Sequence, residues 1–119
     1  MRGIDRLSLP IAHGEGRLYA RESDLNLFWE HRQVGARYVQ GEICDFLQLP
    51  ADPNGSIENI AAMVGGSGRI LGMMPHPERA IASTQLPHWR ELRASGATDI
   101  VDRPGPGLQI FTNIATYFR

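Results

Sequence analysis

The stretch Gly-Arg-Ile-Leu-Gly-Met-Met-Pro-His-Pro-Glu-Arg-Ala, at residues 68–80, decides how this chain is interpreted. Its apolar part, Ile70 to Met74, indicates a short strand that ends at a Pro-His-Pro-Glu corner. Each proline fixes its own φ angle and directs the residue before it toward extended conformations. Because residues two apart in an extended chain lie on the same face, we expect the side chains of His76 and Glu78 to lie together.

This histidine and carboxylate have a chemical use as a pair. A carboxylate that accepts one ring N–H of a histidine fixes the tautomer and orientation of the ring and stabilises the imidazolium that forms during proton transfer. The corner therefore predicts the base and the orienting acid of a nucleophilic triad whose nucleophile is still to be identified. A solvated turn without catalytic function is the alternative for a His-x-Glu pair at a strand end.

Composition places the chain among ordinary globular proteins. It has 119 residues, of which 42% are apolar and 21% charged, and a length of this kind predicts one domain. A net charge of −1 without a basic block argues against nucleic acid or an anionic membrane as the main partner. No apolar run approaches the ~20 residues of a membrane span, and residues 1–10 lack the core of a signal peptide. The single cysteine, Cys44, excludes an internal disulfide and favours a reducing compartment, the cytoplasm.

Hydrophobic periodicity and turn residues predict a mixture of strands and helices. We expect strands at residues 7–12, 17–20, 36–39, 60–64 and 69–74, and helices at residues 24–31, 86–94 and 108–118. Residues 42–49 are expected to extend the strand at 36–39 or to pair with it. The short Gly-Gly-Ser-Gly connection at 65–68 indicates an antiparallel hairpin, and because a strand follows these glycines they are not a phosphate cradle. The fold class predicted is α/β with short antiparallel hairpins.

Three local features refine this outline. Ser23 is expected to cap the first helix at its N-terminus. Residues 52–56, Asp-Pro-Asn-Gly-Ser, are typical of a turn. In the last helix Ile110, Phe111, Ile114 and Phe118 recur at helical spacing, which predicts core positions.

Three motifs in order carry a resemblance to a known family. They are Leu-Pro-Ile-Ala-His-Gly-Glu-Gly-Arg at residues 9–17, Asp-Pro-Asn-Gly-Ser at 52–56 and Gly-Met-Met-Pro-His-Pro-Glu-Arg-Ala at 72–80. The chain resembles the glutaminase subunits of phosphoribosylformylglycinamidine synthases, a branch of the class I glutamine amidotransferases of purine biosynthesis. The entry into the last helix, Gly-Leu-Gln-Ile-Phe at 107–111, matches as well.

The resemblance implies a fold and an activity. Residues 1–119 would form the C-terminal half of a flavodoxin-like, three-layer domain, and the half that bears the nucleophilic cysteine would be absent. By resemblance His76 is the general base and acid, Glu78 orients it, and His13 and Glu15 lie near the mouth of the active site without a catalytic role. The completed enzyme would hydrolyse glutamine to glutamate and ammonia.

The resemblance also implies partners. Ammonia would pass to a synthetase subunit, and that subunit would use ATP and Mg²⁺, whereas this chain would bind no cofactor or metal. The chain itself would pair with the missing half or self-associate. On this reading the strand at 69–74 and the helix at 108–118 keep apolar surface exposed when the chain is isolated.

Other interpretations stay open. Cys44 lies between acidic residues in a stretch expected to be a strand, so an inert, buried thiol is favoured over a nucleophile. A non-catalytic amidotransferase-like piece that docks on a synthetase subunit is an alternative to an enzyme fragment. A metal-dependent hydrolase using His13, His76, Glu78 and His88 is a third reading, although no His-x-x-x-His helix or cysteine pair supports it.

Overall fold

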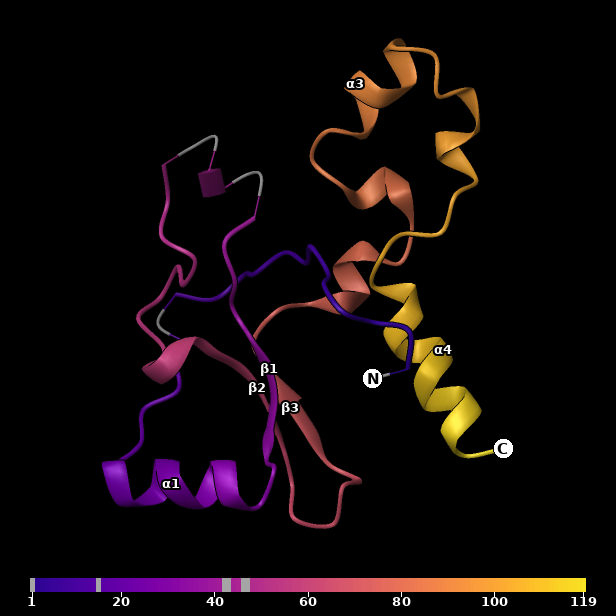
Figure 1. Ribbon diagram of the computed structural model, residues 1–119. Helices are drawn as coiled ribbons and strands as arrows, with labels where there is room; N and C mark the ends of the chain where they lie inside the picture. The colour runs from indigo at the N-terminus through magenta and orange to yellow at the C-terminus, as the bar shows by residue number, and fades with distance from the viewer. Residues whose placement is uncertain (1, 15, 42–43, 46–47) are drawn as a thin grey trace. The chain divides into compact units, whose positions relative to one another are not determined.

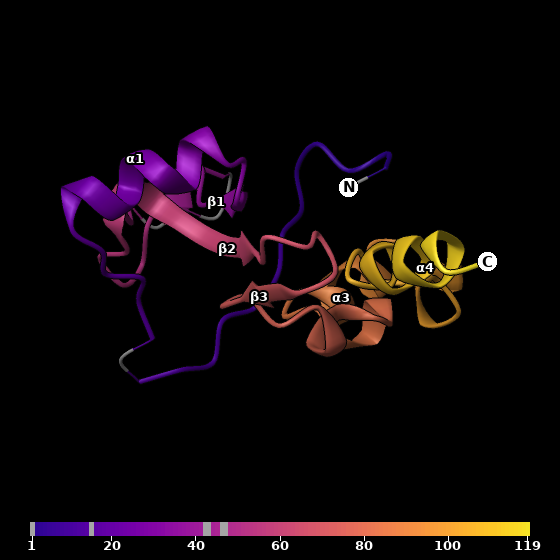
Figure 2. The same cartoon turned by 90° about the horizontal axis from the view of Figure 1, so that it is seen from below.

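The computed structural model of this chain describes residues 2–14, 16–41, 44–45 and 48–119. It separates into two compact units, and we describe each by itself. The sheet unit is His13–Pro75, and the helical unit combines Met1–Ala12 with His76–Arg119. Figures 1 and 2 show the sheet in the first unit and the short helices that follow His76 in the second. No helix among the described residues is long and apolar enough to span a membrane.

The sheet unit is built on a three-stranded antiparallel sheet (Figure 1). Its strands are β1 (Val34–Arg37), β2 (Ile60–Val64) and β3 (Leu71–Met73), in the order β1-β2-β3. The bounds of β2 match the prediction, and β2 and β3 form the hairpin that the glycine-rich connection predicted. Gly68 has φ +71° in that connection, a conformation that favours glycine.

One helix and one 3₁₀ turn complete the sheet unit. Helix α1 spans Glu22–Glu30, close to the predicted range, but its N-cap is Arg21 and not Ser23. The 3₁₀ turn η1, Ile57–Asn59, leads directly into β2. Leu25 of α1 and the first three residues of β2, 60–62, form the buried core of this unit.

The helical unit consists of short turns and two helices. In chain order its elements are η2 (Pro77–Ala80), η3 (Ser83–Gln85), α3 (Trp89–Ala94), η4 (Thr98–Val101) and α4 (Leu108–Tyr117). Ala80, Ile100 and Ile110 form its core. Gly96, with φ +109°, follows α3 as expected of a glycine that ends a helix.

Two of the predicted strands are wrong. Residues 7–12 form no strand, because Pro10 has no N–H and its carbonyl accepts a single bond, 2.7 Å long, from the His76 N–H. Residues 17–20 form none either. The Leu18 N–H donates to Ser56 Oγ and the Leu18 carbonyl accepts from the Ile57 N–H, and this one pair of bonds does not extend into a ladder.

The strand expected at residues 42–49 is also not found where the chain is described. Cys44 and Asp45 are helical, with the Asp45 N–H donating to the Gly41 carbonyl at 2.9 Å. The Leu49 N–H donates to the Cys44 carbonyl at 2.8 Å. Residues 42, 43, 46 and 47 lie outside the described part. Local helical hydrogen bonds replace the strand pairing that the apolar pattern suggested.

The predicted core face of the last helix is only partly buried. Helix α4 forms as expected, but Ile110 alone is buried there, at 2% exposure. Phe111, Ile114 and Phe118 are 40%, 45% and 68% exposed. The core assignment is therefore wrong for these three residues, whereas the expectation of exposed apolar surface holds for them. It holds also for Ile70, which is 67% exposed.

The fold class is confirmed as a mixture of helices and strands with a short antiparallel hairpin. The assignment of residues 1–119 to one partial domain stays a prediction.

Candidate functional site

His76 and Glu78 meet at the corner that the sequence singled out. His76 Nδ1 lies 2.9 Å from Glu78 Oε1, within hydrogen-bond distance. Their side chains are 32% and 56% exposed, so the pair is open to solvent. With Nδ1–H donating to the carboxylate, the neutral ring presents the lone pair of Nε2. That nitrogen makes no hydrogen bond among the described residues, and it is the atom that can act as a base.

The backbone brings the two side chains together in a way that differs from the prediction. His76 is extended, with φ −103° and ψ 91°, but the chain then turns into η2 at Pro77. Glu78 therefore stands in the first turn of a 3₁₀ helix for which His76 is the N-cap. Proline at the first helical position is compatible with its missing N–H, which explains why the chain turns there. The expected pairing is present, whereas the fully extended corner is wrong.

The turn that carries Glu78 is held by the loop before α4. The Gly107 N–H donates to the Ala80 carbonyl at 2.8 Å, and the Gly105 N–H donates to the Ile81 carbonyl at 2.8 Å. Ala80 is fully buried. At the start of the turn, the His76 N–H donates a hydrogen bond to the Pro10 carbonyl. His76 and Glu78 thus stand on a backbone turn that hydrogen bonds hold at both ends.

A second polar cluster lies in the sheet unit around His13. The Gly16 N–H donates to His13 Nδ1 at 3.0 Å, and Asn54 Nδ2 lies 3.1 Å from His13 Nε2. The Asn54 amide also donates to the Gly16 carbonyl. Both ring nitrogens of His13 therefore lie within hydrogen-bond distance of other residues of the sheet unit. Glu15 lies outside the described residues.

Tyr38 extends this cluster with an unusual feature. Tyr38 Oη and Asn54 Oδ1 are both buried, yet neither makes a hydrogen bond among the described residues. Burial raises the pKa of Tyr38 above its ordinary value of 10.0 and is the largest cause of the shift. The Asn54 side chain lowers this pKa, and the Asp52 carboxylate raises it. Sequence reasoning missed Tyr38, and it read Asn54 only as a turn residue. No pattern in the sequence connects the two.

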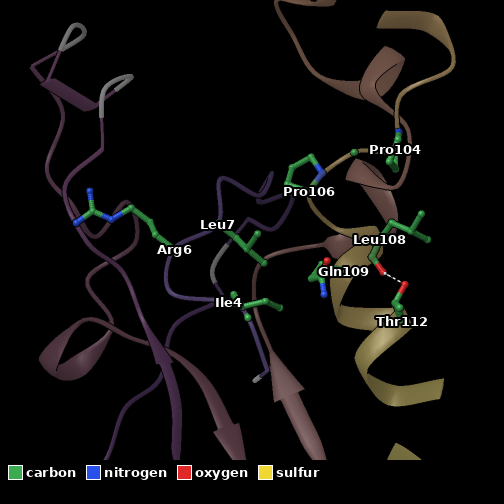
Figure 3. A pocket seen from close by; sticks show the side chains of 10 residues that line it. Ile4, Arg6, Leu7, Pro104, Pro106, Leu108, Gln109 and Thr112 are labelled. Atoms are coloured by element: carbon green, nitrogen blue, oxygen red, sulfur yellow. Dashed lines mark hydrogen bonds between the residues drawn. The ribbon is translucent and has the colours of Figure 1, made fainter. Parts of the chain in front are cut away.

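An open pocket lies in each unit. In the sheet unit a pocket of about 390 Å³ is lined mainly by β2 and β3, with Arg17 and Asn54 as polar residues. In the helical unit a pocket of about 460 Å³ lies between the N-terminal segment and α4. Figure 3 shows Ile4 and Leu7 on one side of it and Leu108, Gln109 and Thr112 on the other. Neither His76 nor Glu78 lines these pockets.

The remaining candidate residues do not form a catalytic or metal-binding group where the chain is described. Cys44 is a half-buried free thiol. No three His, Cys, Asp or Glu side chains in the described ranges gather so that they could hold a metal ion. The reading of His13, His76, Glu78 and His88 as metal ligands therefore gains no support.

Comparison with known proteins identifies the family. Residues 1–118 match the CobB/CobQ-like glutamine amidotransferase domain. The subunit PurQ of phosphoribosylformylglycinamidine synthase from Methanococcus maripaludis is 36% identical over 121 residues, which cover 98% of this chain and 44% of the relative. The PurQ subunit from Methanothrix thermoacetophila is 42% identical over 120 residues, with 98% of this chain and 42% of the relative covered. No solved structure matches the chain at a significant level.

The chain thus spans less than half the length of these curated relatives. Its mixed helices and strands and its antiparallel sheet are consistent with part of a class I glutamine amidotransferase domain. The match extends over both units and includes the Pro-His-Pro-Glu corner. The chain belongs to the family of CobB/CobQ-like glutamine amidotransferase domains.

Proposed function

We propose that this chain is the His- and Glu-bearing, C-terminal part of a glutaminase that supplies ammonia to a phosphoribosylformylglycinamidine synthase. The observation that carries the proposal is the 2.9 Å pair of His76 Nδ1 and Glu78 Oε1 within a chain of the amidotransferase family. The relatives named PurQ, which are subunits of that synthase, supply the substrate class. The site is the glutamine-hydrolysing site of the completed domain.

The chemistry follows from the free Nε2 of His76. In the completed domain a cysteine thiol gives its proton to Nε2 as its sulfur attacks the amide carbon of glutamine. His76 then passes the proton to the departing nitrogen, the C–N bond breaks, and ammonia leaves behind a thioester. In the second half His76 takes a proton from water, whose oxygen attacks the thioester, and returns that proton to sulfur. Glu78 holds the ring and stabilises the imidazolium in both halves.

Partners are part of the same proposal. The ammonia passes to a synthetase subunit that carries the ATP and Mg²⁺ chemistry, and this chain contributes none of it. The isolated chain is expected to show no glutaminase activity, because a base and an orienting acid fail without their nucleophile. Glutamate release by the isolated chain that Cys44→Ser abolishes would contradict this and would make Cys44 the nucleophile.

The test is reconstitution. The portion of the Methanothrix relative that this chain does not match is supplied with the chain, and glutamate release is measured. His76→Ala should lower turnover about 10³- to 10⁴-fold, the scale of a general base. His88→Ala is the matched control, because it changes another histidine of the helical unit outside the proposed pair. Turnover that His76→Ala leaves near normal would refute the assignment.

The second candidate is a non-catalytic module that docks on a synthetase subunit. The observation that favours it is that His76 Nε2 has no nucleophile bonded to it among the described residues. Association with a synthetase subunit, together with no glutamate release from the reconstituted protein, would distinguish this function from the first.

A further inference from the structure

Two sequence motifs that the proposed glutaminase chemistry does not use meet in the sheet unit. The His-Gly-Glu-Gly motif contributes His13 and Gly16, and the Asp-Pro-Asn-Gly-Ser turn contributes Asn54. The Asn54 amide nitrogen, Nδ2, donates to the Gly16 carbonyl and lies 3.1 Å from His13 Nε2. All three residues belong to the sheet unit, so the contact between the two motifs is internal to it.

Asn54 precedes a glycine, and an Asn-Gly pair is chemically labile. It is the single such pair in the sequence, since the other asparagines, at positions 26, 59 and 113, precede leucine or isoleucine. The glycine nitrogen can attack the side-chain carbonyl carbon of the asparagine, because a glycine has no side chain to obstruct it and restricts the backbone least. The Gly55 N–H donates to no acceptor in the part of the chain that the structure describes. That nitrogen is therefore available as a nucleophile.

The reaction replaces one C–N bond by another. The Gly55 nitrogen loses its proton to water and bonds to Cγ of Asn54. The Cγ–Nδ2 bond breaks, and the amide nitrogen takes up a proton from water and leaves as ammonia. Water then adds to one of the two carbonyl carbons of the resulting succinimide and opens the ring to aspartate or isoaspartate at residue 54. Water is the only co-reactant.

The turn resists the movement that this reaction needs. Cγ must reach bonding distance of the Gly55 nitrogen, which requires rotation about the backbone and side-chain torsions of Asn54. The Asn54 N–H donates to Asp52 Oδ1 at 3.0 Å, so the backbone is held before the reacting pair. After the pair, Ser56 is 5% exposed and its Oγ donates to the Ile60 carbonyl at 2.6 Å. The backbone is thus restrained on both sides of the Asn-Gly pair.

His13 and Gly16 restrain the side chain of Asn54. The Gly16 N–H lies 3.0 Å from His13 Nδ1, and a neutral imidazole accepts through only one of its two nitrogens. The ring therefore accepts either from Gly16 or from Asn54, but in both tautomers it fills the space beside Nδ2. A Cβ on Gly16 would stand 2.9 Å from His13 Cγ, so close packing also sets the position of the Gly16 carbonyl.

We propose that Asn54 is a deamidation site that the contact with His13 and Gly16 protects in the folded chain. The modification is one-way. An aspartate at residue 54 places an oxygen where Nδ2 now donates to the Gly16 carbonyl, so a hydrogen bond becomes a contact between two acceptors. It also adds a negative charge near Asp52. Opening of the contact exposes Asn54 to reaction, and reaction prevents the contact from forming again. The inference is independent of the proposed glutaminase function.

The first experiment needs no variant. Wild-type chain is incubated at mildly alkaline pH, folded and in urea, and aspartate and isoaspartate at residue 54 are measured by mass spectrometry of its peptides. Asn54 should react at least ~10-fold more slowly in the folded chain, because reaction requires a locally open state. Asn26, which precedes leucine, is the internal reference and should react far more slowly than Asn54 in urea. Equal rates for Asn54 in the two conditions would overturn the proposal.

Variants then test the contribution of His13. His13→Ala removes the ring beside Nδ2 and should raise the rate at Asn54 in the folded chain at least ~5-fold. His31→Ala changes an exposed histidine of the same unit and should leave the rate within ~2-fold. Where circular dichroism shows that His13→Ala is unfolded, His13→Gln, which also lacks the ring, takes its place. A wild-type rate in the folded His13 variant would refute the proposal. A slower rate would refute it too, because His13 would then promote the reaction by giving a proton to the departing ammonia.

A last comparison tests whether the modification is one-way. Asn54→Asp carries the product side chain and should lower the urea midpoint of unfolding, because the Gly16 carbonyl loses its donor. Asn26→Asp makes the same chemical change at an exposed position of α1 and should leave the midpoint close to that of wild type. Equal midpoints for the two variants would show that the contact forms as well after modification as before it, which the proposal excludes.

Discussion

Gly107 and Pro77 approach each other so closely that no side chain fits between them. A Cβ built on Gly107 would lie 2.1 Å from the Pro77 carbonyl oxygen and 3.0 Å from the Ala80 carbonyl oxygen. Real Cβ atoms do not come this near to backbone oxygen, and backbone cannot yield as a flexible side chain does. The absence of a side chain at residue 107 is therefore what allows α4 to start against the turn that carries Glu78.

The first prediction tests this contact. Gly107→Ala should destabilise the chain by about 3 kcal/mol, because overpacking against backbone forces η2 and α4 apart. Gly72→Ala is the control, since a Cβ on Gly72 meets nothing within 4 Å, and it should change stability by no more than ~0.5 kcal/mol. Urea unfolding of both variants gives the comparison. Equal midpoints would show that the two elements separate without cost.

The second prediction concerns Glu78 in the reconstituted enzyme. Glu78→Gln keeps the length of the side chain and removes its charge, so the ring loses its charged acceptor but His76 remains. Turnover should fall about 10- to 100-fold, less than for His76→Ala, because the pair is open to water that can replace part of the interaction. Steady-state glutamate release measures it. A loss as large as that of His76→Ala would mean that Glu78 itself takes part in proton transfer.

The third prediction concerns the Tyr38 hydroxyl. Oη is buried without a hydrogen-bond partner among the described residues, so its removal in Tyr38→Phe relieves a desolvated polar group. Unfolding free energy at pH 7 should stay unchanged or rise by up to ~1 kcal/mol. A loss of more than ~1 kcal/mol would reveal a hydrogen bond that the described residues do not provide.

The raised pKa of Tyr38 gives the fourth prediction, a dependence on alkaline pH. Below pH 10.0, the ordinary value, tyrosine keeps its proton in both states. As the pH rises from there toward the higher folded pKa, the unfolded chain loses the proton while the folded chain retains it, so the folded state becomes less stable. Above pH 10.0 the unfolding free energy of wild type should therefore fall relative to that of Tyr38→Phe. A difference that is constant from pH 8 to 11 would contradict this.

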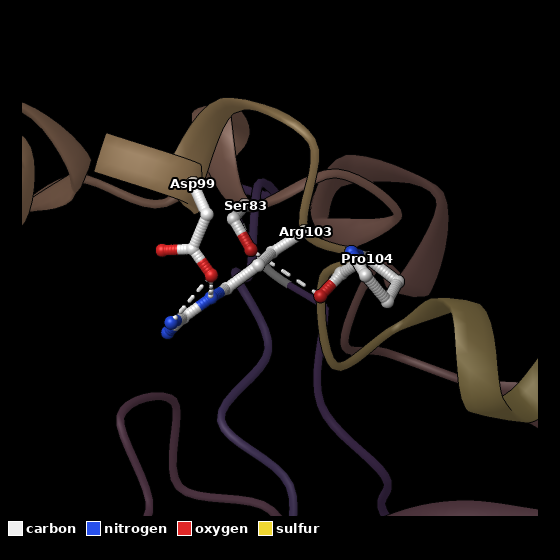
Figure 4. Close-up of polar contacts among 4 residues, drawn as sticks. All are labelled: Ser83, Asp99, Arg103 and Pro104. Carbon is white, nitrogen blue, oxygen red and sulfur yellow. Dashed lines mark hydrogen bonds and ion pairs between the residues drawn. The ribbon is translucent and has the colours of Figure 1, made fainter. Parts of the chain in front are cut away.

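The fifth prediction compares how much a buried hydroxyl and an exposed ion pair contribute to stability (Figure 4). Ser83 is 5% exposed and donates through Oγ to the Pro104 carbonyl at 3.2 Å. Arg103 Nη2 lies 2.7 Å from Asp99 Oδ2, but both side chains are more than half exposed. Ser83→Ala should lower the unfolding free energy by about 1 kcal/mol, because it removes the hydrogen bond that the buried hydroxyl donates. Asp99→Asn should cost less than ~0.5 kcal/mol. The reverse order in thermal unfolding would show that the ion pair stabilises this loop more than the hydroxyl does.

Sequence reasoning succeeded where a local signal was sufficient. The bounds of β2, the β2–β3 hairpin and the positions of α1 and α4 follow from periodicity and glycine-rich turns within a few residues. The pairing of His76 with Glu78 was likewise predictable, because two residues separated by one proline can reach each other in several backbone conformations. For the same reason the pair forms although the chain turns into a 3₁₀ helix and does not stay extended.

The errors lie where a residue depends on a distant partner. Residues 7–12 and 17–20 have the apolar character of strands, but a strand requires a neighbour with free N–H and carbonyl groups along its length, and each finds only isolated bonds. Phe111 and Ile114 have the spacing of a core face, yet they are 40% and 45% exposed, because spacing cannot say whether another segment covers them. Tyr38 and Asn54 affect each other although they are 16 residues apart, and no sequence pattern connects them.

By itself, then, the sequence determined the family motifs, the hairpin and the pairing of His76 with Glu78. The corner depends on the φ restrictions at Pro75 and Pro77 and on two side chains that are two residues apart. Such effects are local, so the sequence can predict them. The tertiary structure alone decided that Gly107 packs directly against the turn that carries Glu78, and that Phe111 and Ile114 are exposed. It also decided that Tyr38 Oη is buried without a hydrogen-bond partner in the described part of the chain. Close packing and burial are properties of segments brought together from far apart, so they exist only once the chain has folded.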